Sequence, residues 1–170
     1  MIFQDPMSSL NPRHRVGQII AAPLSLHGLD NTQARALDAL DHVGLPRSFA
    51  RRFPHELSGG QRQRVGIARA IALKPDFILA DEIVSGLDVS SQAQVLNLLE
   101  QLVKDLGLTL AFISHDLSVI RRLCTRILVL HHGVIVENAA TADVFAAPQA
   151  QYTRDLLDAI PLPDPDQVWV

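Results

Sequence analysis

The alternation of apolar and polar positions divides the chain into a helical part, followed by a part in which helices and strands alternate. Apolar residues recur at helical spacing through residues 8–53, which predicts a group of short helices. Further along, the pattern predicts a helix over 62–73, a strand over 76–80, a long amphipathic helix ending at Gly107 and a strand over 108–113. Nearly continuous apolar strands between amphipathic helices are typical of a mostly parallel sheet with helices on both faces. The predicted fold class is therefore α/β, with a helical subdomain added to it.

Shorter elements are predicted at both ends of this pattern. The chain starts with a short strand at Met1–Phe3. After residue 113 we expect a helix from about Asp116, a hairpin of strands 127–130 and 134–136, a helix over 152–160 and an extended proline-rich end. These elements suggest three parts: a helical subdomain over 8–73, an α/β core part over 74–138 and a helical extension with its tail over 139–170.

Composition narrows the functional classes. The 170 residues are 48% hydrophobic and 19% charged, which fits one globular domain and excludes general disorder. A net charge of -3 gives no broad basic field, so nucleic acid is not an expected partner. Cys124 is the single cysteine, which excludes an internal disulfide and a cysteine-based metal cage. No apolar run approaches the roughly 18 residues of a membrane span, and no signal peptide opens the chain, so we expect a cytoplasmic location without a membrane span.

The most specific local motif is Leu57-Ser58-Gly59-Gly60-Gln61 at the start of a predicted helix. Ser58 is suited to cap this helix, and the two glycines leave backbone amides unshielded. Such a helix start meets an anion such as a phosphate without a side chain in the way. The alternative is an ordinary capped Ser-Gly-Gly linker.

Two adjacent carboxylates, Asp81 and Glu82, follow the predicted strand that ends at Ala80. Open α/β sheets bind their ligands at this end of their strands. An aspartate in this place is suited to hold Mg²⁺, and its neighbour to orient or deprotonate an attacking water. Taken singly, such a pair more often belongs to a solvated turn; the segment Ser85–Asp88 and the helix that follows it favour a site.

His115 directly follows the next predicted strand. Successive parallel strands end at the same edge of a sheet, so Asp81, Glu82 and His115 are expected to converge on one ligand. Gln4, after the first short strand, is expected at the same edge as a contact for water or metal. A lone histidine at a strand end is otherwise most simply a structural or exposed residue.

The series of motifs resembles the nucleotide-binding subunits of ABC transporters. In chain order they match the Q-loop at Gln4, the signature at Leu57–Gln61, the Walker B segment at Phe77–Glu82, the D-loop at Ser85–Asp88 and the switch histidine at His115. The segment Phe3–Pro12 is similar to the oligopeptide and dipeptide importer branch. The resemblance implies a P-loop NTPase domain of the ABC type, of which this chain holds a part.

The resemblance also implies a mechanism, in which two nucleotide-binding subunits enclose ATP and Mg²⁺ between them. Ser58, Gly59, Gly60 and Gln61 would contact nucleotide bound by the partner subunit, and Asp88 would cross the interface.

Within the same mechanism, Asp81 would bind Mg²⁺ with Gln4, Glu82 would polarise the hydrolytic water, and His115 would stabilise the γ-phosphate. Gln4 would report the nucleotide state to membrane permease subunits, on which the helical subdomain docks. This implies a subunit peripheral to the inner face of the cell membrane.

One motif of the family is absent from the sequence: no G-x-x-x-x-G-K-[ST] segment occurs, and neither lysine, Lys74 or Lys104, follows a glycine. We therefore expect a C-terminal part of a longer domain that does not hydrolyse ATP independently. The missing part should leave apolar surface and strand edges uncovered.

Two other interpretations stay open at this point. One is a soluble ABC-type ATPase that acts on nucleic acid, and the other is a non-catalytic remnant that serves as an interaction module. The sequence also leaves open whether the transported solute is a peptide, nickel or another small molecule, and whether the subunit pairs with itself or with a related subunit.

Overall fold

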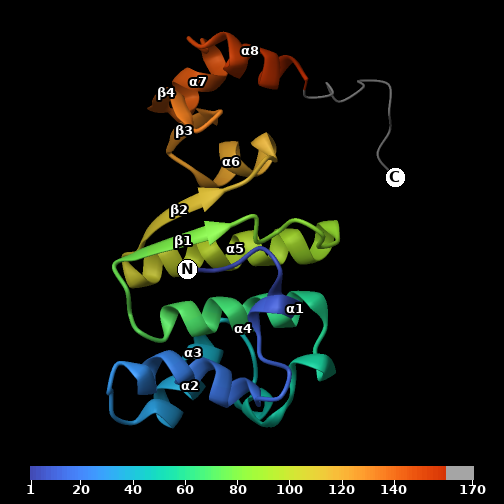
Figure 1. Cartoon of the computed structure of the whole chain (residues 1–170), viewed down its shortest axis with the longest axis vertical. Helices are drawn as coiled ribbons and strands as arrows, with labels where there is room; N and C mark the ends of the chain where they lie inside the picture. The colour runs from blue at the N-terminus through green and yellow to red at the C-terminus, as the bar shows by residue number, and fades with distance from the viewer. Residues whose placement is uncertain (160–170) are drawn as a thin grey trace. The chain divides into compact units, whose positions relative to one another are not determined.

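The computed structural model describes residues 1–159, and the chain forms two compact units, Met1–Ile113 and a second that starts at Ser114 (Figure 1). The first unit contains α1 (Pro6–Ser9), α2 (Val16–Leu26), α3 (Thr32–His42), the 3₁₀ turns η1 (Arg47–Arg51) and η2 (Pro54–Glu56), α4 (Gly59–Ile71), β1 (Phe77–Asp81), α5 (Val89–Leu106) and β2 (Thr109–Ile113). The second contains α6 (Leu117–Leu123), β3 (Arg126–His131), β4 (Val134–Ala140), α7 (Thr141–Ala146) and α8 (Gln151–Asp158).

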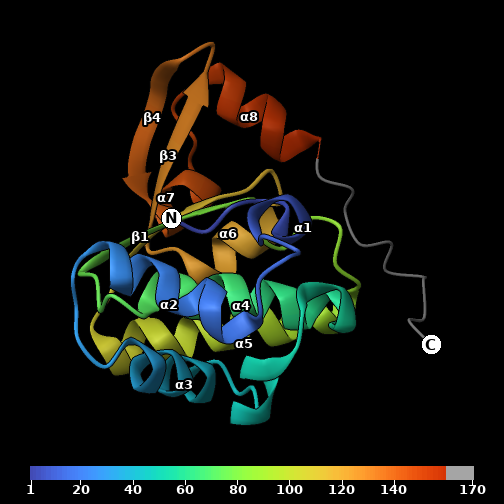
Figure 2. The ribbon, with the colours of Figure 1, turned by 60° about the horizontal axis from the view of Figure 1, so that its bottom comes forward.

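The helical part of the first unit is a bundle in which α2, α3 and α4 pack against one another (Figure 2). Its centre is built from aliphatic side chains that are entirely buried, among them Ile20, Leu24, Leu40, Val65 and Ile67. Burying such side chains is the main favourable contribution to folding. These three helices therefore form a packed bundle within the first unit.

β1 and β2 form a parallel pair in which Phe77 lies opposite Thr109 and Asp81 opposite Ile113. Ile2 extends this sheet on the other edge of β1, because its N–H donates to Leu79 at 2.8 Å and its carbonyl accepts from Asp81 at 3.1 Å. The prediction of a strand at Met1–Phe3 is therefore wrong in extent, since a single residue pairs. The parallel α/β prediction itself is confirmed.

The buried side of α5 differs from the one that hydrophobic periodicity predicts. Helical spacing of the apolar residues in the sequence predicts one buried side, made of Val95, Leu98, Leu99, Leu102, Val103 and Leu106. The buried residues are Val95, Leu96, Leu99 and Leu102, whereas Leu106 is 38% exposed. The buried stripe is rotated toward Leu96 because the packing partners of α5, including α4, set which side faces inward. Gly107 ends the helix in a left-handed conformation (φ 64°), as predicted.

Side chains at the first residues of the helices satisfy backbone amides that have no partner inside the helix. At α5, the Asp88 carboxylate accepts from the Ser91 N–H at 2.8 Å and from the Ser91 hydroxyl at 2.7 Å. These two hydrogen bonds hold the pKa of Asp88 below its ordinary value. At α6, Asp116 accepts in the same way from Ser118 N–H at 2.9 Å.

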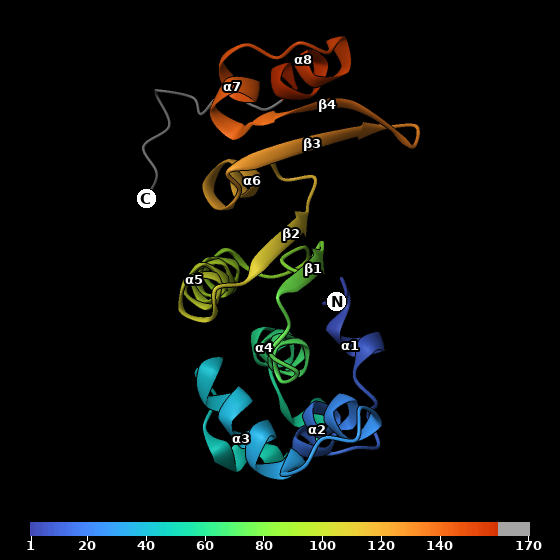
Figure 3. The ribbon, with the colours of Figure 1, turned by 90° about the vertical axis from the view of Figure 1, so that its left-hand side faces the viewer.

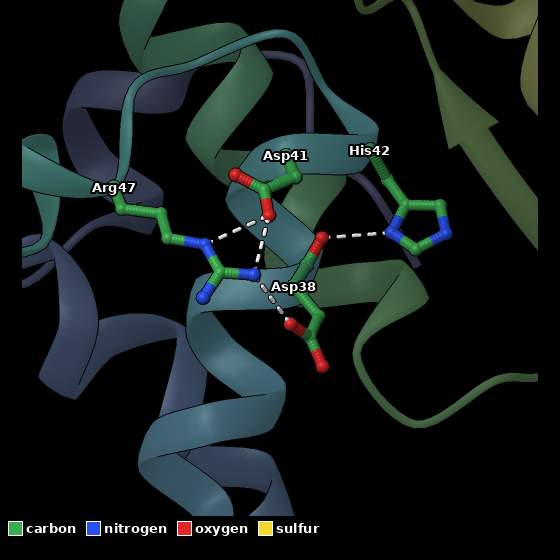
Figure 4. A network of polar contacts seen from close by, with 4 residues as sticks. All are labelled: Asp38, Asp41, His42 and Arg47. Carbon is green, nitrogen blue, oxygen red and sulfur yellow. Dashed lines mark hydrogen bonds and ion pairs between the residues drawn. The ribbon is translucent and has the colours of Figure 1, made fainter.

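A surface network ties α3 to the turn that follows it (Figure 4). The Arg47 guanidinium donates to Asp41 at 2.9 Å through Nε and to Asp38 at 2.9 Å through Nη2, while His42 Nδ1 lies 2.7 Å from the Asp38 carbonyl oxygen. Asp41, and to a lesser degree Asp38, raise the pKa of Arg47. All three charged side chains are about half exposed, so the network fixes local geometry and adds little to global stability.

The second unit is built on the antiparallel hairpin of β3 and β4, with α7 and α8 packed against it (Figure 3). The predicted hairpin is confirmed, and its turn residues His132 (φ 51°) and Gly133 (φ 78°) both adopt positive φ angles. Apolar side chains remain exposed along both strands, among them Leu128, Leu130, Val134 and Ile135. The predicted helix over 152–160 corresponds to α8, and the proline-rich tail lies outside the described residues.

The division between the units falls at residue 113, inside the part that the sequence assigned to an α/β core over 74–138. The three-part division at residues 8–73, 74–138 and 139–170 stays a prediction.

We expect Leu24→Ala to lower the free energy of unfolding by about 3 kcal/mol, because it leaves a cavity in the centre of the bundle. The matched control is Leu26→Ala on the same helix, since Leu24 is fully buried and Leu26 is 86% exposed. The control should change the free energy of unfolding by about 0.5 kcal/mol or less. Urea titrations of the full chain measure both values, and equal losses would contradict the packing described for α2.

Asp88 should make stability depend on pH. Because the folded state lowers its pKa, its contribution is complete above the unfolded pKa of about 4 and is lost as the pH falls through the lower folded pKa. Asp88→Asn removes this titration, so the stability difference between the natural chain and the variant should shrink as the pH falls from about 6 toward 3. Urea midpoints at several pH values measure the difference, and a constant difference would rule out the titration of Asp88 as its source.

Candidate functional site

The register between Ile2 and β1 brings Gln4 beside Glu82. Ile2 lies opposite Ala80, and the two segments run in the same direction. Gln4 and Glu82, each two positions further along, are therefore expected side by side. Accordingly, the Gln4 side-chain Nε2 donates to the Glu82 Oε2 at 2.6 Å. Two of the residues singled out from the sequence thus meet at the carboxyl edge of the parallel pair, the end at which β1 and β2 finish.

The backbone at Glu82, directly after the end of β1, has an unusual conformation. Its φ of 47° lies in the left-handed region, which is uncommon for a residue other than glycine. The conformation is held on both sides, because the Glu82 N–H donates to the Ile113 carbonyl at 2.9 Å and the Glu82 carbonyl accepts from Ser85 at 3.1 Å. Non-glycine residues with such angles cluster at functional sites, where the surrounding structure maintains them.

Asp81 is the last residue of β1 and is half-buried. Within residues 1–159 its carboxylate makes no hydrogen bond or ion pair, so its oxygens are available to a ligand. Carboxylate and amide oxygens are the ligands that Mg²⁺ takes in proteins, which makes Asp81 and Gln4 a chemically suitable pair. No group of three or more His, Cys, Asp or Glu side chains suited to a metal occurs in the described part of the chain.

The predicted signature turn forms the first turn of α4, which begins at Gly59 rather than at the expected Arg62. The two glycines are helical because Ser58 and Gln61 cap the helix reciprocally. The Ser58 Oγ accepts from the Gln61 N–H at 3.3 Å, and the Gln61 Oε1 accepts from the Ser58 N–H at 3.0 Å. The Gln61 side chain, predicted to bind nucleotide, is thus engaged in the cap.

Both glycines of this turn have room for a side chain. A Cβ on Gly59 would lie 3.8 Å from Leu87 Cδ2, and one on Gly60 would lie 3.5 Å from Ser91 Oγ, both ordinary contacts. Neither glycine has a positive φ angle. Packing and backbone conformation within this chain therefore leave the two glycines unexplained, whereas close approach of an outside group would require them.

The same contacts bring the signature turn next to the start of α5, where Asp88 is located. Ser91, which contacts Gly60 and hydrogen-bonds to Asp88, was not singled out from the sequence. The spacing of Asp88 and Ser91, three residues apart at the start of a helix, was the available signal.

His115 belongs to the second unit, one residue after its start. Its approach to Asp81 and Glu82 therefore stays a prediction. The neighbouring Ser114 Oγ accepts from the Asp116 N–H at 3.0 Å, which shapes the turn that leads into α6.

A hollow of about 640 Å³ lies elsewhere in the first unit, among α2, α3 and η1. Its lining includes Arg15, Gln33, Leu37 and Arg51 and none of the residues predicted for the site. Over residues 1–159, no helix combines the length and apolar character needed to cross a membrane.

Comparisons with known proteins agree with the motif series. The family model described as ABC transporter matches residues 1–85. Among curated proteins, the chain is 56% identical over 169 residues to a protein of Brucella ovis described as a peptide import ATP-binding protein, covering 97% of this chain and 53% of the relative. It is 53% identical over 170 residues to the oligopeptide transport ATP-binding protein OppF of Bacillus subtilis, covering 98% of this chain and 56% of the relative.

The solved structures give the same result for the fold. The dimeric structure of MJ0796, a bacterial ABC transporter cassette, superposes with a TM-score of 0.69 at 32% identity, covering 82% of this chain and 61% of that chain. The chain spans about half the length of the curated relatives that it matches. A family match over residues 1–85, with identity above 50% to two curated relatives, shows that the chain belongs to the ABC transporter family.

Proposed function

We propose that the chain acts as an ATP-binding and ATP-hydrolysing subunit that drives a peptide-type ABC importer, working together with a second nucleotide-binding subunit. The observation that carries the proposal is the 2.6 Å hydrogen bond between Gln4 and Glu82. It puts an amide and a carboxylate at the carboxyl edge of a parallel pair, where open α/β sheets bind their ligands. The names of the curated relatives, which concern peptide or oligopeptide transport, support a peptide as the solute.

At the carboxyl edge, Glu82 would accept a proton from the water that attacks the γ-phosphate. The bond between the γ-phosphorus and the bridging oxygen would break, and ADP would leave with its electron pair. Asp81 and the amide oxygen of Gln4 would hold Mg²⁺, which supplies positive charge against the phosphate oxygens. His115 would stabilise the γ-phosphate during the transfer. The hydrogen bonds at the backbone of Glu82 support this role, because a base must stay fixed relative to the water that it activates.

The signature turn would serve the nucleotide of the partner subunit. The amides at the start of the 13-residue helix α4 form a positive end suited to phosphate oxygens, and Gly59 and Gly60 leave them uncovered. Ser58 would add its hydroxyl, Gln61 would shape the turn through the cap, and Asp88 would contact the partner across the interface. Neither glycine is required by steric conflict with the described residues, which supports an approach from outside the chain.

The helical subdomain would dock on membrane permease subunits and hold the protein at the inner face of the membrane. In the site that this chain's signature turn completes, a G-x-x-x-x-G-K-[ST] segment of the partner subunit would hold the phosphates.

Gly60→Ala should reduce ATP turnover by about tenfold or more when the full chain is mixed with its partner nucleotide-binding subunit, because the methyl group displaces the phosphate. Gly66→Ala on the same helix is the matched control, since no atom lies within 4 Å of its Cβ position. It should keep full turnover and stabilise the helix by up to about 1 kcal/mol. Steady-state phosphate release measures turnover, and equal rates for both variants would exclude the signature turn from the site.

Glu82→Gln should lower turnover of the nucleotide at this chain's own carboxyl edge on the order of 10²- to 10⁴-fold while ATP binding persists there, because the amide cannot accept the proton. Glu100→Gln, an exposed position on α5, makes the same chemical change and should keep full turnover. Equilibrium binding of a fluorescent ATP analogue separates binding from chemistry. If the Glu82 variant keeps the turnover of the natural chain, Glu82 is not the general base.

A further inference from the structure

The segment from Ile2 to Leu10 spans the distance between the sheet and the signature helix, and it is fixed at each end. At the sheet end, Ile2 is 1% exposed and pairs with β1, and Gln4 contacts Glu82. At the helix end, Leu10 is also 1% exposed, and α1 packs against α4. We call this segment, residues 2–10, the strap.

The interior of the strap is held by local hydrogen bonds. The Asp5 carboxylate accepts from the Ser8 N–H at 3.2 Å, and the Asp5 carbonyl accepts from the Ser9 N–H at 3.2 Å. These bonds close the single helical turn of α1 directly after Gln4. Gln4 and Ser9 are therefore connected by a single hydrogen-bonded turn, so a displacement of Ser9 should also displace Gln4.

Arg69 of α4 fixes the end of that turn. Its Nη1 donates to the Ser9 carbonyl oxygen at 2.6 Å, a short hydrogen bond from a charged donor. Burial lowers the pKa of the Arg69 guanidinium, because the charged group loses part of its hydration. This arginine lies outside the motif segments matched in the sequence, in α4 eleven positions after the helix-capping Ser58.

We propose that Arg69 is a positioning residue that ties the signature helix to the Gln4–Glu82 contact, so that the turn that serves the partner's nucleotide and the carboxyl edge of this chain move together. Arg69 touches neither Gln4 nor Glu82 and acts through the Ser9 carbonyl and the strap. Movement of α4 at the partner's nucleotide thereby shifts Gln4 relative to Glu82. The hydrolytic consequence rests on the proposed function, whereas the mechanical link does not.

The direct test follows the side-chain amide of Gln4 by NMR in the full chain, with the signal assigned through Gln4→Leu. A hydrogen bond to a carboxylate displaces this signal from that of a free glutamine amide. Arg69→Met keeps the apolar stem but loses the donor, and it should remove at least half of the displacement. Arg69→Lys retains one donor and should restore part of it.

The matched control is Arg64→Met on the same helix. Arg64 donates to the Val43 carbonyl and to Gln94, away from the strap. Its loss should leave the Gln4 signal unchanged. If Arg69→Met leaves the signal at its natural position, or if Arg64→Met shifts it equally, the proposal is overturned. Should Arg69→Met fail to fold, Arg69→Gln, which is polar but too short to reach Ser9, decides by the same signal.

A second arm measures ATP turnover with the partner nucleotide-binding subunit. Arg69→Met should lower kcat about tenfold and leave KM for ATP within twofold, because the side chain positions the site without touching nucleotide. A change in KM alone would contradict a positioning role. If the natural chain supports no turnover or nucleotide binding in any mixture, the proposed function fails, while the NMR result still decides the link between Arg69 and Gln4.

Discussion

The parallel pairing of Ile2 with β1 is the interaction on which the candidate site depends. Its two backbone hydrogen bonds fix the register, and the register brings Gln4 beside Glu82. A slip of one residue would turn the Gln4 side chain to the opposite face of the sheet. Because Ile2 is almost fully buried, such a slip would also expose an isoleucine, which adds a hydrophobic cost to the change.

The polar groups around the site divide into those that hold the structure and those left for a ligand. Gln61 and Asp88, both singled out as functional residues, already accept hydrogen bonds that start α4 and α5. Within the described residues, the Asp81 carboxylate makes no hydrogen bond, and packing does not require the two signature glycines. A residue that caps a helix beside a ligand surface serves both tasks, because the cap orients the amides that the ligand meets.

Apolar side chains stay exposed on the β3–β4 hairpin and at the ends of the β1–β2 pair, where Phe77 and Ile113 are about half exposed. The sequence predicted strands covered on both faces, and its apolar runs were correctly assigned to strands. What covers a strand depends on segments distant in sequence, which local periodicity does not record. The same reason explains α5, whose buried stripe includes Leu96 and not Leu106.

The sequence by itself determined the element types, the cap at Ser58, the helix start near Asp116, the helix end at Gly107, the hairpin turn and the family, because each depends on residues a few positions apart. Only the tertiary structure decided that Gln4 bonds to Glu82, that Ser91 lies against Gly60 and that Arg69 reaches Ser9. These contacts join positions far apart in the chain, or reflect how packed elements meet, and they follow from the register of strands and the packing of helices. The motifs marked which residues matter, and the packing set which of them touch.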